Sequence, residues 1–362
     1  MTSTAVRAQF ELRPLVIPTQ IDGDDAADFI AMTEVRNIIY REISGNDDEA
    51  LSPSQLLAHF APSPDELRIA WVIAVEGAVV GRMIVDLPQE SGSRVAYWLI
   101  ELLESVQGQG IGSALYPTIE DTARAHGRSV LESWAEHPEA PGPRLEPPTG
   151  FGSIPHDRYA RFYLRHGYTL EQVDRKSVLA LDAASVPAAE LLVVAEDHSP
   201  GYRIAQWTLP TPPEHRDGYA EVKSRMSTDA PAAGLEYDEE AWDAARVSRN
   251  DARYLEAGQT VLVTVAIAAD SGRIVAFNEL CSGRDEQAAT QQLDTLVLKE
   301  HRGHRLGQRV KCAGILRWRE MMPLSPRILT FNAEENRPML DINEAIGFVP
   351  AAYIGAWKRT LT

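Results

Sequence analysis

Cysteine is nearly absent from this chain of 362 residues, which contains only Cys281 and Cys312. The two are far apart in the sequence and form no CxxC pair, so we predict neither a disulfide framework nor a zinc site. The nine histidines include no HExxH sequence. The sequence therefore argues against a disulfide-stapled domain and against a metal-dependent enzyme of the zinc-protease type, and we expect no metal.

Long hydrophobic runs are also missing. The longest clearly apolar run, Val261 to Ala269, is far shorter than the roughly 20 residues that a membrane-spanning helix needs. Residues Met1 to Phe10 contain no apolar core of signal-peptide length. We therefore expect a cytoplasmic protein with no membrane partner, present as a monomer or a homodimer.

Positive charge is scarce. The chain has 35 Lys and Arg against 52 Asp and Glu, for a formal net charge of −17. A field of this sign repels nucleic acid and attracts cationic molecules such as amines. Hydrophobic residues make up 44% of the chain, which is enough for ordinary buried cores. At roughly 100–200 residues per domain, we expect about two or three domains.

The predicted order of strands and helices occurs twice. Strands are predicted at 13–21, 68–75, 78–86, 94–103 and 130–135, and again at 202–209, 260–268, 273–280, 291–298 and 327–332. Helices are predicted at 24–43, 54–60, 113–125 and 158–165, and again at 217–225, 238–255, 308–321 and 338–346. A closing strand pair is predicted over 168–181. Each half is thus a mixed α/β unit.

Two segments interrupt the repeat. Residues 183–201 mix Ala, Pro and acidic residues, and we interpret them as a linker with a helical middle between domains 1–182 and 202–362. Residues 137–157 are rich in Pro and Gly, and long loops of this kind are usually functional or disordered. Two histidines of this loop, His137 and His156, are expected at the surface. Arg302 follows Gln107 by 195 positions, whereas Gly347 follows Gly167 by only 180. The insertion at 137–157 lies between Gln107 and Gly167, so it accounts for the difference between the two spacings.

A loop with closely spaced glycines precedes a predicted helix in each half. The loops read Gln107-Gly108-Gln109-Gly110-Ile111-Gly112 and Arg302-Gly303-His304-Arg305-Leu306-Gly307. The first N–H groups of a helix lack partners and attract anions, and glycines let a pyrophosphate approach the backbone. The spacing fits neither the Rossmann GxGxxG pattern, since Ser113 stands in the last glycine position, nor the Walker loop.

These loops resemble the Q/R-x-x-G-x-G/A phosphate loop of the GNAT superfamily of N-acetyltransferases, with Arg305 replacing the usual glycine in the second. Residues Ala160 to Tyr168 are similar to the superfamily's A-x-x-F-Y-x-x-x-G-F/Y signature. Residues Asn336 to Phe348 are similar to N-x-x-M-x-x-I-N-x-x-x-G-F. The four motifs occur in the right order, and the resemblance covers nearly the whole chain apart from the linker and the insertion. It identifies a tandem member of the superfamily.

The resemblance implies the fold and the co-substrate. Each domain would be a mixed β-sheet flanked by helices and splayed beside the loop-bearing strand, with the acetyl-pantetheine arm of acetyl-CoA in the splay. The implied acetyl-CoA-binding residues of the first half are Leu102, Leu103, Glu104, Gln107, Gly108, Gln109, Gly110, Ile111, Gly112 and Ser113. Those of the second half are Val297, Arg302, Gly303, His304, Gly307 and Asn336. Asn336 is equally a candidate helix N-cap before Pro338.

The resemblance also implies a catalytic acid. Members often place a Tyr four residues before the helix-closing Gly, where it protonates the departing thiolate, and Tyr163 occupies that position. The matching residue of the second half is Asn343, a poor acid, so we favour the first half as catalytic. A packed aromatic is the alternative interpretation of Tyr163.

The candidate bases are Glu101, Glu104 and Glu132. We place Glu101 and Glu132 on the strands that flank the splay, where partial burial would raise the pKa of a carboxyl and suit it to proton transfer. An exposed strand residue of an acidic protein is the alternative for each glutamate.

The distribution of positive charge favours the second half instead as the coenzyme-binding half. Its loop carries a basic cluster, which is Lys299, His301, Arg302, Arg305, Arg309 and Lys311. Coenzyme A carries several phosphate charges, so this loop is also a candidate coenzyme site, while an exposed helix face is the alternative. We therefore expect one catalytic half and one half that binds, supports or shapes the acceptor site.

The acceptor that the acidic balance favours is a small cationic amine. An aminoglycoside-like sugar amine fits, with antibiotic modification as the biological role. A mycothiol-synthase-like reaction or acetylation of a protein amine uses the same chemistry. A coenzyme A-binding sensor without activity is the alternative of another class, and it is supported only by the departures at Arg305 and Asn343.

Overall fold

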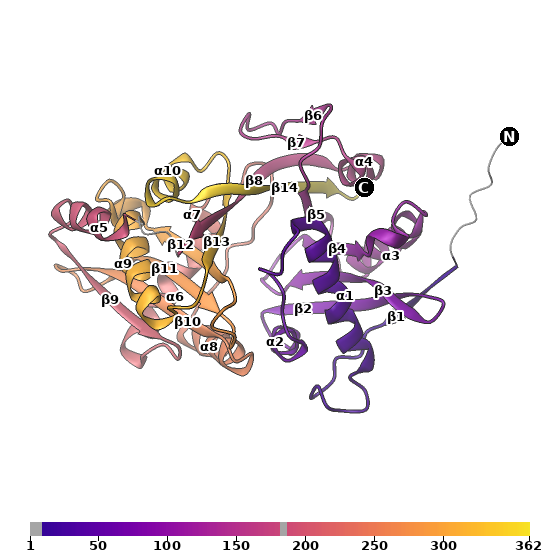
Figure 1. The fold of residues 1–362 in the computed structure, drawn as a ribbon, viewed down its shortest axis with the longest axis horizontal. Helices are drawn as coiled ribbons and strands as arrows, with labels where there is room; N and C mark the ends of the chain where they lie inside the picture. Colours follow the sequence, from indigo (N-terminus) through magenta and orange to yellow (C-terminus); the bar gives the residue numbers. More distant parts are fainter. Residues whose placement is uncertain (1–8, 182–186) are drawn as a thin grey trace. The chain divides into compact units, whose positions relative to one another are not determined.

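The computed structural model describes residues 9–181 and 187–362, which form two compact units (Figure 1). The first unit comprises the described residues up to Val173 together with Ala233–Glu236 and Tyr353–Thr362. The second comprises Asp174–Ala232 and Tyr237–Ala352, apart from the residues that are not described. The sequence instead suggests an uninterrupted division at 183–201, and that division into sequence repeats stays a prediction.

The first unit is a six-stranded mixed sheet with helices on both faces. Its strands follow the order β1-β2-β3-β4-β5-β14. They are β1 (Phe10–Pro14), β2 (Glu66–Val75), β3 (Ala78–Pro88), β4 (Val95–Leu102), β5 (Val130–His137) and the end of β14 (Val349–Thr360). The helices are α1 (Ala27–Ser44), α2 (Pro53–His59), α3 (Ile111–Ala125) and α4 (Arg158–Arg165). The predicted helices and strands up to residue 165 are present, except that the strand expected at 13–21 is instead β1 at Phe10–Pro14, and residues 15–21 form no strand.

Strand alternation divides the side chains of this sheet between two cores. Ile84 and Leu99 pack with Phe29 and Met32 of α1. The neighbours of these two strand residues, such as Trp98, pack instead with α3 and α4. Successive side chains of a strand point to opposite faces, so α1 and α2 cover one face of the sheet and α3 and α4 cover the other.

The sheet splays where the resemblance predicts. Strands β4 and β5 pair in parallel only at Val95, Ala96 and Tyr97, opposite Val130, Leu131 and Glu132. Beyond Tyr97, β4 continues to Leu102 and β5 continues to His137 without a further pair between them. Residues 98–102 and 133–137 therefore diverge and leave backbone groups of both strands facing the gap.

The second unit repeats this architecture. Its strands follow the order β8-β13-β12-β11-β10-β9. They are β8 (Thr169–Ala180), β9 (Tyr202–Thr208), β10 (Thr260–Ala268), β11 (Ile274–Ser282), β12 (Thr290–Val297) and β13 (Arg327–Ala333). The helices are α5 (Ala188–Asp197), α6 (Pro213–Ser224), α7 (Met226–Asp229), α8 (Ala244–Glu256), α9 (Leu306–Met321) and α10 (Arg337–Ile346). Strands β12 and β13 pair only at Thr290 and Gln291, so this sheet also splays.

Two strands do not pair as the sequence predicts. The expected closing strand pair over 168–181 is wrong, because these residues form one long strand, β8. From Asp174 onward, β8 pairs antiparallel with β13 of the second unit. The position beside β5 in the first unit is taken by the last strand of the chain, which pairs from Tyr353 to Thr360 with His137 to Val130. Each unit is thus completed by a strand from the other half of the sequence.

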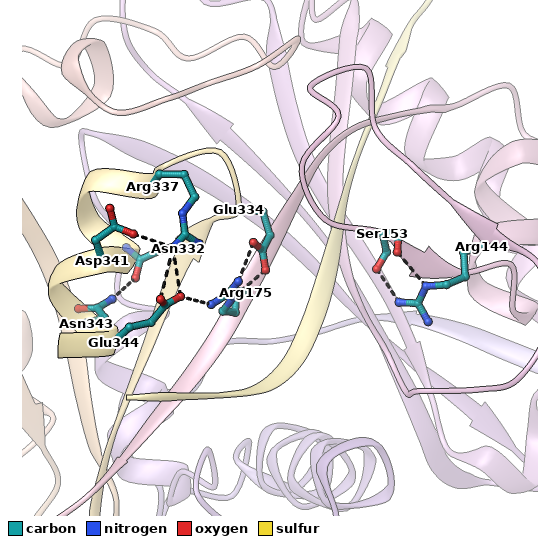
Figure 2. Close-up of polar contacts among 9 residues, drawn as sticks. All are labelled: Arg144, Ser153, Arg175, Asn332, Glu334, Arg337, Asp341, Asn343 and Glu344. Atoms are coloured by element: carbon teal, nitrogen blue, oxygen red, sulfur yellow. Dashed lines mark hydrogen bonds and ion pairs between the residues drawn. The ribbon is translucent and has the colours of Figure 1, made fainter. Parts of the chain in front are cut away.

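The Pro/Gly-rich insertion is ordered by its own contacts. It contains a small hairpin of β6 (Arg144–Leu145) and β7 (Ile154–Pro155). Figure 2 shows the Arg144 guanidinium donating to the side-chain and backbone oxygens of Ser153, both at 2.8 Å. The expectation of a surface His137 is wrong, because that ring is buried and its Nδ1 lies 3.1 Å from both carboxylate oxygens of Asp157.

The described residues were searched for membrane-spanning helices and for metal-binding groups of side chains. Among the helices of residues 9–181 and 187–362, none is long and apolar enough to cross a membrane. In the same part of the chain, no group of three or more His, Cys, Asp or Glu side chains is arranged to hold a metal ion.

Candidate active site

The loop between β4 and α3 presents an open helix N-terminus. Gly108 and Gly110 adopt the left-handed conformation, with φ of +76° and +85°, and no atom lies within 4 Å of a Cβ built on either. Among the described residues, no side chain caps the first N–H groups of α3. This is the backbone arrangement that binds an anion.

The side chains of this loop are used for local structure. Gln107 donates from Nε2 to the Leu102 carbonyl at 2.7 Å, and Gln109 donates to the Ser105 carbonyl at 3.1 Å. Ile111 is buried, and Ser113 lies 3.3 Å from His166 of α4. The predicted contribution of this loop to phosphate binding therefore falls to its backbone N–H groups.

The loop between β12 and α9 repeats this geometry. Arg302 donates from Nε to the Val297 carbonyl at 3.2 Å, at the positions that match Gln107 and Leu102. Gly303 has a φ of +86°, and Arg305 adopts the left-handed conformation with a φ of +54°. His304 lies beside the ring of Tyr202, and no described side chain caps α9.

The helix that follows each loop packs closely against the next helix in the chain, which also fits the predicted diphosphate-binding loop. A Cβ on Gly112 would lie 3.3 Å from the Phe162 ring, and one on Gly307 would lie 3.1 Å from Ile342. Both glycines therefore let the loop helix pack closely against the following helix. The residues present fit a bound diphosphate in both units, and this site would supply hydrogen bonds from uncapped helix termini.

The left-handed positions allow a paired test of stability. Gly110→Ala is expected to destabilise the protein by about 1 kcal/mol, because a Cβ disfavours this conformation. At the matching position, Arg305→Gly is expected to stabilise it by a similar amount. Urea unfolding followed by tryptophan fluorescence measures both. Two shifts of the same sign would contradict the assignment.

Some backbone N–H groups of the residues predicted to line the pantetheine already donate hydrogen bonds within the protein. The Leu103 N–H donates to the Val80 carbonyl of β3 at 2.9 Å. The Glu104 N–H donates to Glu42 at 2.9 Å. Among these residues, Leu102 and Leu103 pack against the core that contains Trp98.

Tyr163 projects from α4 between the two diverging strands. Its hydroxyl lies 2.8 Å from Ser133 Oγ on β5, and its ring lies 5.6 Å from Trp98 on β4. Trp357 of β14 stacks on it, with centroids 4.8 Å apart and an interplanar angle of 6°. Burial raises the pKa of Tyr163 well above its usual value, although the hydrogen bond to Ser133 opposes the shift. The hydroxyl therefore stays protonated at neutral pH and can donate a hydrogen bond.

The second unit has no such acid at this position. Asn343 is buried and donates to Asn332 Oδ1 of β13 at 2.7 Å, as Figure 2 shows. Its own Oδ1 accepts from Lys311 Nζ of α9 at 2.8 Å. Burial lowers the pKa of Lys311 to about 7. An amide thus stands where the first unit has the phenol of Tyr163.

Glu101 is held by a buried cation. Its Oε2 accepts from Arg82 Nε at 2.6 Å, and the Arg82 side chain is 5% exposed. Arg82 also lies 3.4 Å from the Tyr40 hydroxyl of α1. The carboxylate of Glu101 is therefore neutralised by a partner on the neighbouring strand, which weakens it as a candidate base.

Glu132 lies on β5 at the point where the pairing with β4 ends. It is fully buried, and its Oε1 accepts from the Glu236 N–H at 2.7 Å. Its Oε2 has no partner among the described residues. Burial raises the pKa of Glu132 to about 7, opposed by the Glu236 N–H and by Lys358. A carboxyl that titrates near neutrality can accept a proton at physiological pH.

Part of the basic cluster predicted for the second loop is not available to a ligand. Arg309 is buried and donates to the Ser199 and Tyr202 carbonyls, and Lys311 is also buried. Lys299 lies 3.2 Å from the buried carboxylate of Asp229, and Arg302 donates to the Asp229 carbonyl. The argument from charge for coenzyme binding by the second half is therefore weakened.

Several residues around Tyr163 and Glu132 were missed from the sequence. Ser133 and Arg82 could have been noticed. Ser133 directly follows the candidate Glu132 on its strand, and Arg82 lies opposite the candidate Glu101 on the neighbouring strand. Trp357 and Lys358 carry no local signal, because the strand that brings them lies almost at the end of the chain. Asn336 stands at the N-cap position of α10, as one interpretation predicted, but its side chain makes no capping hydrogen bond.

Comparison with known proteins agrees with this geometry. A family model described as the acetyltransferase (GNAT) family matches residues 32–141, which include β4, the first loop and α3. Residues 32–141 therefore form an acetyltransferase domain of the GNAT family. A chain with this domain is an acyltransferase that uses acetyl-CoA. The match lies in the first unit, and the fold of the second is shown by solved structures.

Solved structures show that the tandem GNAT fold extends over the whole chain. A tandem GNAT protein from the clavulanic acid biosynthesis pathway has a TM-score of 0.70 at 22% identity, covering 97% of this chain and 98% of that chain. A GCN5-related N-acetyltransferase from Sphaerobacter thermophilus has a TM-score of 0.60 at 14% identity, covering 97% and 95%. A glucosamine N-acetyltransferase region of a fungal multi-domain enzyme has a TM-score of 0.61 at 13% identity, covering 98% and 38%. A search of curated protein sequences finds no significant match.

Proposed function

We propose that the first unit of this GNAT protein transfers the acetyl group of acetyl-CoA to a primary amine of a small cationic molecule. The observation that carries the proposal is the position of Tyr163. Its hydroxyl lies beside Ser133, where β4 and β5 have separated, and the second unit has Asn343 instead. Bound acetyl-CoA would supply a thioester, with its diphosphate on the N–H groups of Gln107 to Ser113.

The residues of the first unit divide the proton transfers between the two faces of the sheet. Tyr163 and Ser133 lie on the face of α3 and α4, and Tyr163 donates the proton that the departing thiolate needs. Glu132, which precedes Ser133 on β5, points to the opposite face and accepts a proton from the ammonium group of the acceptor, and the resulting neutral amine attacks the thioester.

The charges on the side of Glu132 favour a cationic acceptor. The negative charges of Glu236 and Glu171 both raise the pKa of the Glu132 carboxyl. The net charge of the chain is −17. Lys358 is paired with Glu236 at 2.9 Å, so the cation in this group is already neutralised. An aminoglycoside-like sugar amine has the size and charge for this side, with antibiotic modification as the corresponding role.

A thiol-release assay with acetyl-CoA and a panel of amines tests the proposal. The panel contains an aminoglycoside, glucosamine, a polyamine and a peptide with a free N-terminus. Glucosamine is included because one protein of similar fold is described as a glucosamine N-acetyltransferase region. Release with the sugar amines supports the proposal, and release with the peptide alone would indicate a protein acceptor. Tight acetyl-CoA binding with no release from any amine would indicate a sensor.

The pH dependence of the first unit should follow Glu132. Because the pKa of Glu132 is raised to about 7, kcat/KM is expected to rise with pH through that value as the carboxylate forms. Glu132→Gln is expected to lower kcat by about 10²-fold, the lower end for a general base, and to remove this limb of the profile. A profile that keeps its limb near pH 7 in the variant would assign the titration to another group.

Glu101→Gln provides the comparison for the base. It leaves the Arg82 guanidinium buried without its carboxylate, so its main effect is expected on stability rather than on the pH profile. If Glu101→Gln removed the pH limb and Glu132→Gln did not, Glu101 would be the base.

A further inference from the structure

An ion cluster lies on the face of the second sheet opposite α9. Lys223 of α6 places its Nζ 3.2 Å from Glu279 Oε2 of β11 and 2.6 Å from Asp294 Oδ2 of β12. Tyr219 of α6 donates a hydrogen bond to the same Glu279 carboxylate. Asp294 lies beyond the last β12 residue that pairs with β13, so it stands on the diverging part of the strand.

Aromatic rings complete the surroundings of the ammonium group. Lys223 Nζ lies 5.1 Å from the centroid of Trp242 and 5.4 Å from that of Phe277. Carboxylates and aromatic faces around one nitrogen are the groups that proteins use to bind ammonium ligands. The charges of Asp294 and Glu279 outweigh burial, which alone would lower the pKa, and hold the pKa of Lys223 above its usual value. The Lys223 ammonium is therefore charged at neutral pH.

The first unit has a group at the corresponding place, but with the charges arranged differently. There Arg82 of β3 pairs with Glu101 of β4, next to Tyr40 of α1. The cation comes from a strand, and a single carboxylate balances it. In the second unit both strands supply carboxylates, and the cation comes from the helix. One ammonium faces two carboxylates there, and the Asp294 side chain is 39% exposed.

We propose that this face of the second unit is a binding site for a primary ammonium ion, and that the chain's own Lys223 occupies it as an internal ligand. External amines are then excluded from the second splay on the side from which an acceptor would approach. The second unit is kept from acetylating amines by occupation of this site as well as by the lack of a tyrosine. The proposal does not depend on the acceptor of the first unit.

Removing the internal ligand and supplying an external one tests the proposal. Lys223→Ala in the full chain deletes the atoms beyond Cβ, and n-propylammonium chloride replaces them. We expect Lys223→Ala to lower the melting temperature. At about ten times its Kd, propylammonium is expected to raise it again by about 3–5 °C. The melting temperature of the wild-type protein is expected to stay unchanged. Sodium chloride and 1-propanol at the same concentration control for ionic strength and for apolar contact.

Two further variants keep the result decisive. Lys299→Ala removes a lysine that pairs with Asp229 elsewhere in the second unit, and Lys223→Met fills the space without a charge. Neither is expected to respond to propylammonium. If Lys223→Ala does not fold alone, its soluble yield on refolding with and without propylammonium is the readout. An equal response in wild type or with the controls, or no recovery with propylammonium, would overturn the proposal.

Discussion

Replacing Tyr163 by Phe is expected to lower kcat for acetyl transfer by about 10²- to 10⁴-fold, the usual contribution of a positioned general acid. The hydroxyl lies 2.8 Å from Ser133 Oγ, and burial keeps it protonated at neutral pH. Phe keeps the ring that stacks on Trp357. The variant is therefore expected to fold and to bind acetyl-CoA normally, so KM for acetyl-CoA should change little.

Tyr168→Phe is the matched control for this prediction. Tyr168 belongs to the same aromatic cluster, with its ring 5.5 Å from that of Tyr163, but its hydroxyl bonds to Tyr116 at 3.0 Å. Both variants lose one buried hydroxyl and should lose a similar amount of stability, whereas only Tyr163→Phe should lose turnover. Full turnover by Tyr163→Phe, together with its loss in Arg302→Ala, would place the reaction in the second unit.

Replacing Arg175 by Met is expected to produce the largest loss of stability. Figure 2 shows Arg175 donating from Nε and Nη2 to both carboxylate oxygens of Glu334, at 2.6 and 2.9 Å, and from Nη1 to Glu344 at 2.8 Å. The side chains of Arg175 and Glu334 are 12% and 8% exposed. Met fills much of the volume but leaves a buried carboxylate without its cation, which costs about 3–5 kcal/mol.

Arg337→Met provides the control in the same network. Arg337 bonds Asp341 at 2.6 Å and Glu344 at 3.3 Å, and all three side chains are more than a third exposed. Its removal should cost about 0–1 kcal/mol. Urea unfolding measures both variants. A deficit equal to that of Arg337→Met at neutral pH would contradict the burial argument.

Features coded by neighbouring residues were predicted well. Glycine spacing and a following apolar period located both loops and the helices α3 and α9, because a helix start depends on a few consecutive residues. The position of Tyr163 followed from its distance to Gly167 along one short helix. The parallel splay was implied by the resemblance, and it is confirmed by the end of pairing at Tyr97 and Glu132.

Features that depend on residues far along the chain were not predicted from the sequence. The basic cluster looked like one surface in the sequence, yet helical periodicity turns Arg309 and Lys311 into the interior. Glu101 and Glu132 looked alike, but Arg82 neutralises the first and burial raises the pKa of the second. A sequence shows which groups ionise, whereas their partners and exposure follow from packing.

The sequence by itself predicted two tandem repeats, each with a strand, a glycine-containing loop and a helix, and it places Tyr163 in the first where the second has Asn343. Tertiary structure alone decided that β8 completes the second sheet and the chain's last strand completes the first. It also decided that Trp357 stacks on Tyr163 and that Lys223 lies between two carboxylates. The physical reason is that helix caps and turns are selected by adjacent residues, while strand pairing and the solvation of a charge depend on residues far along the chain.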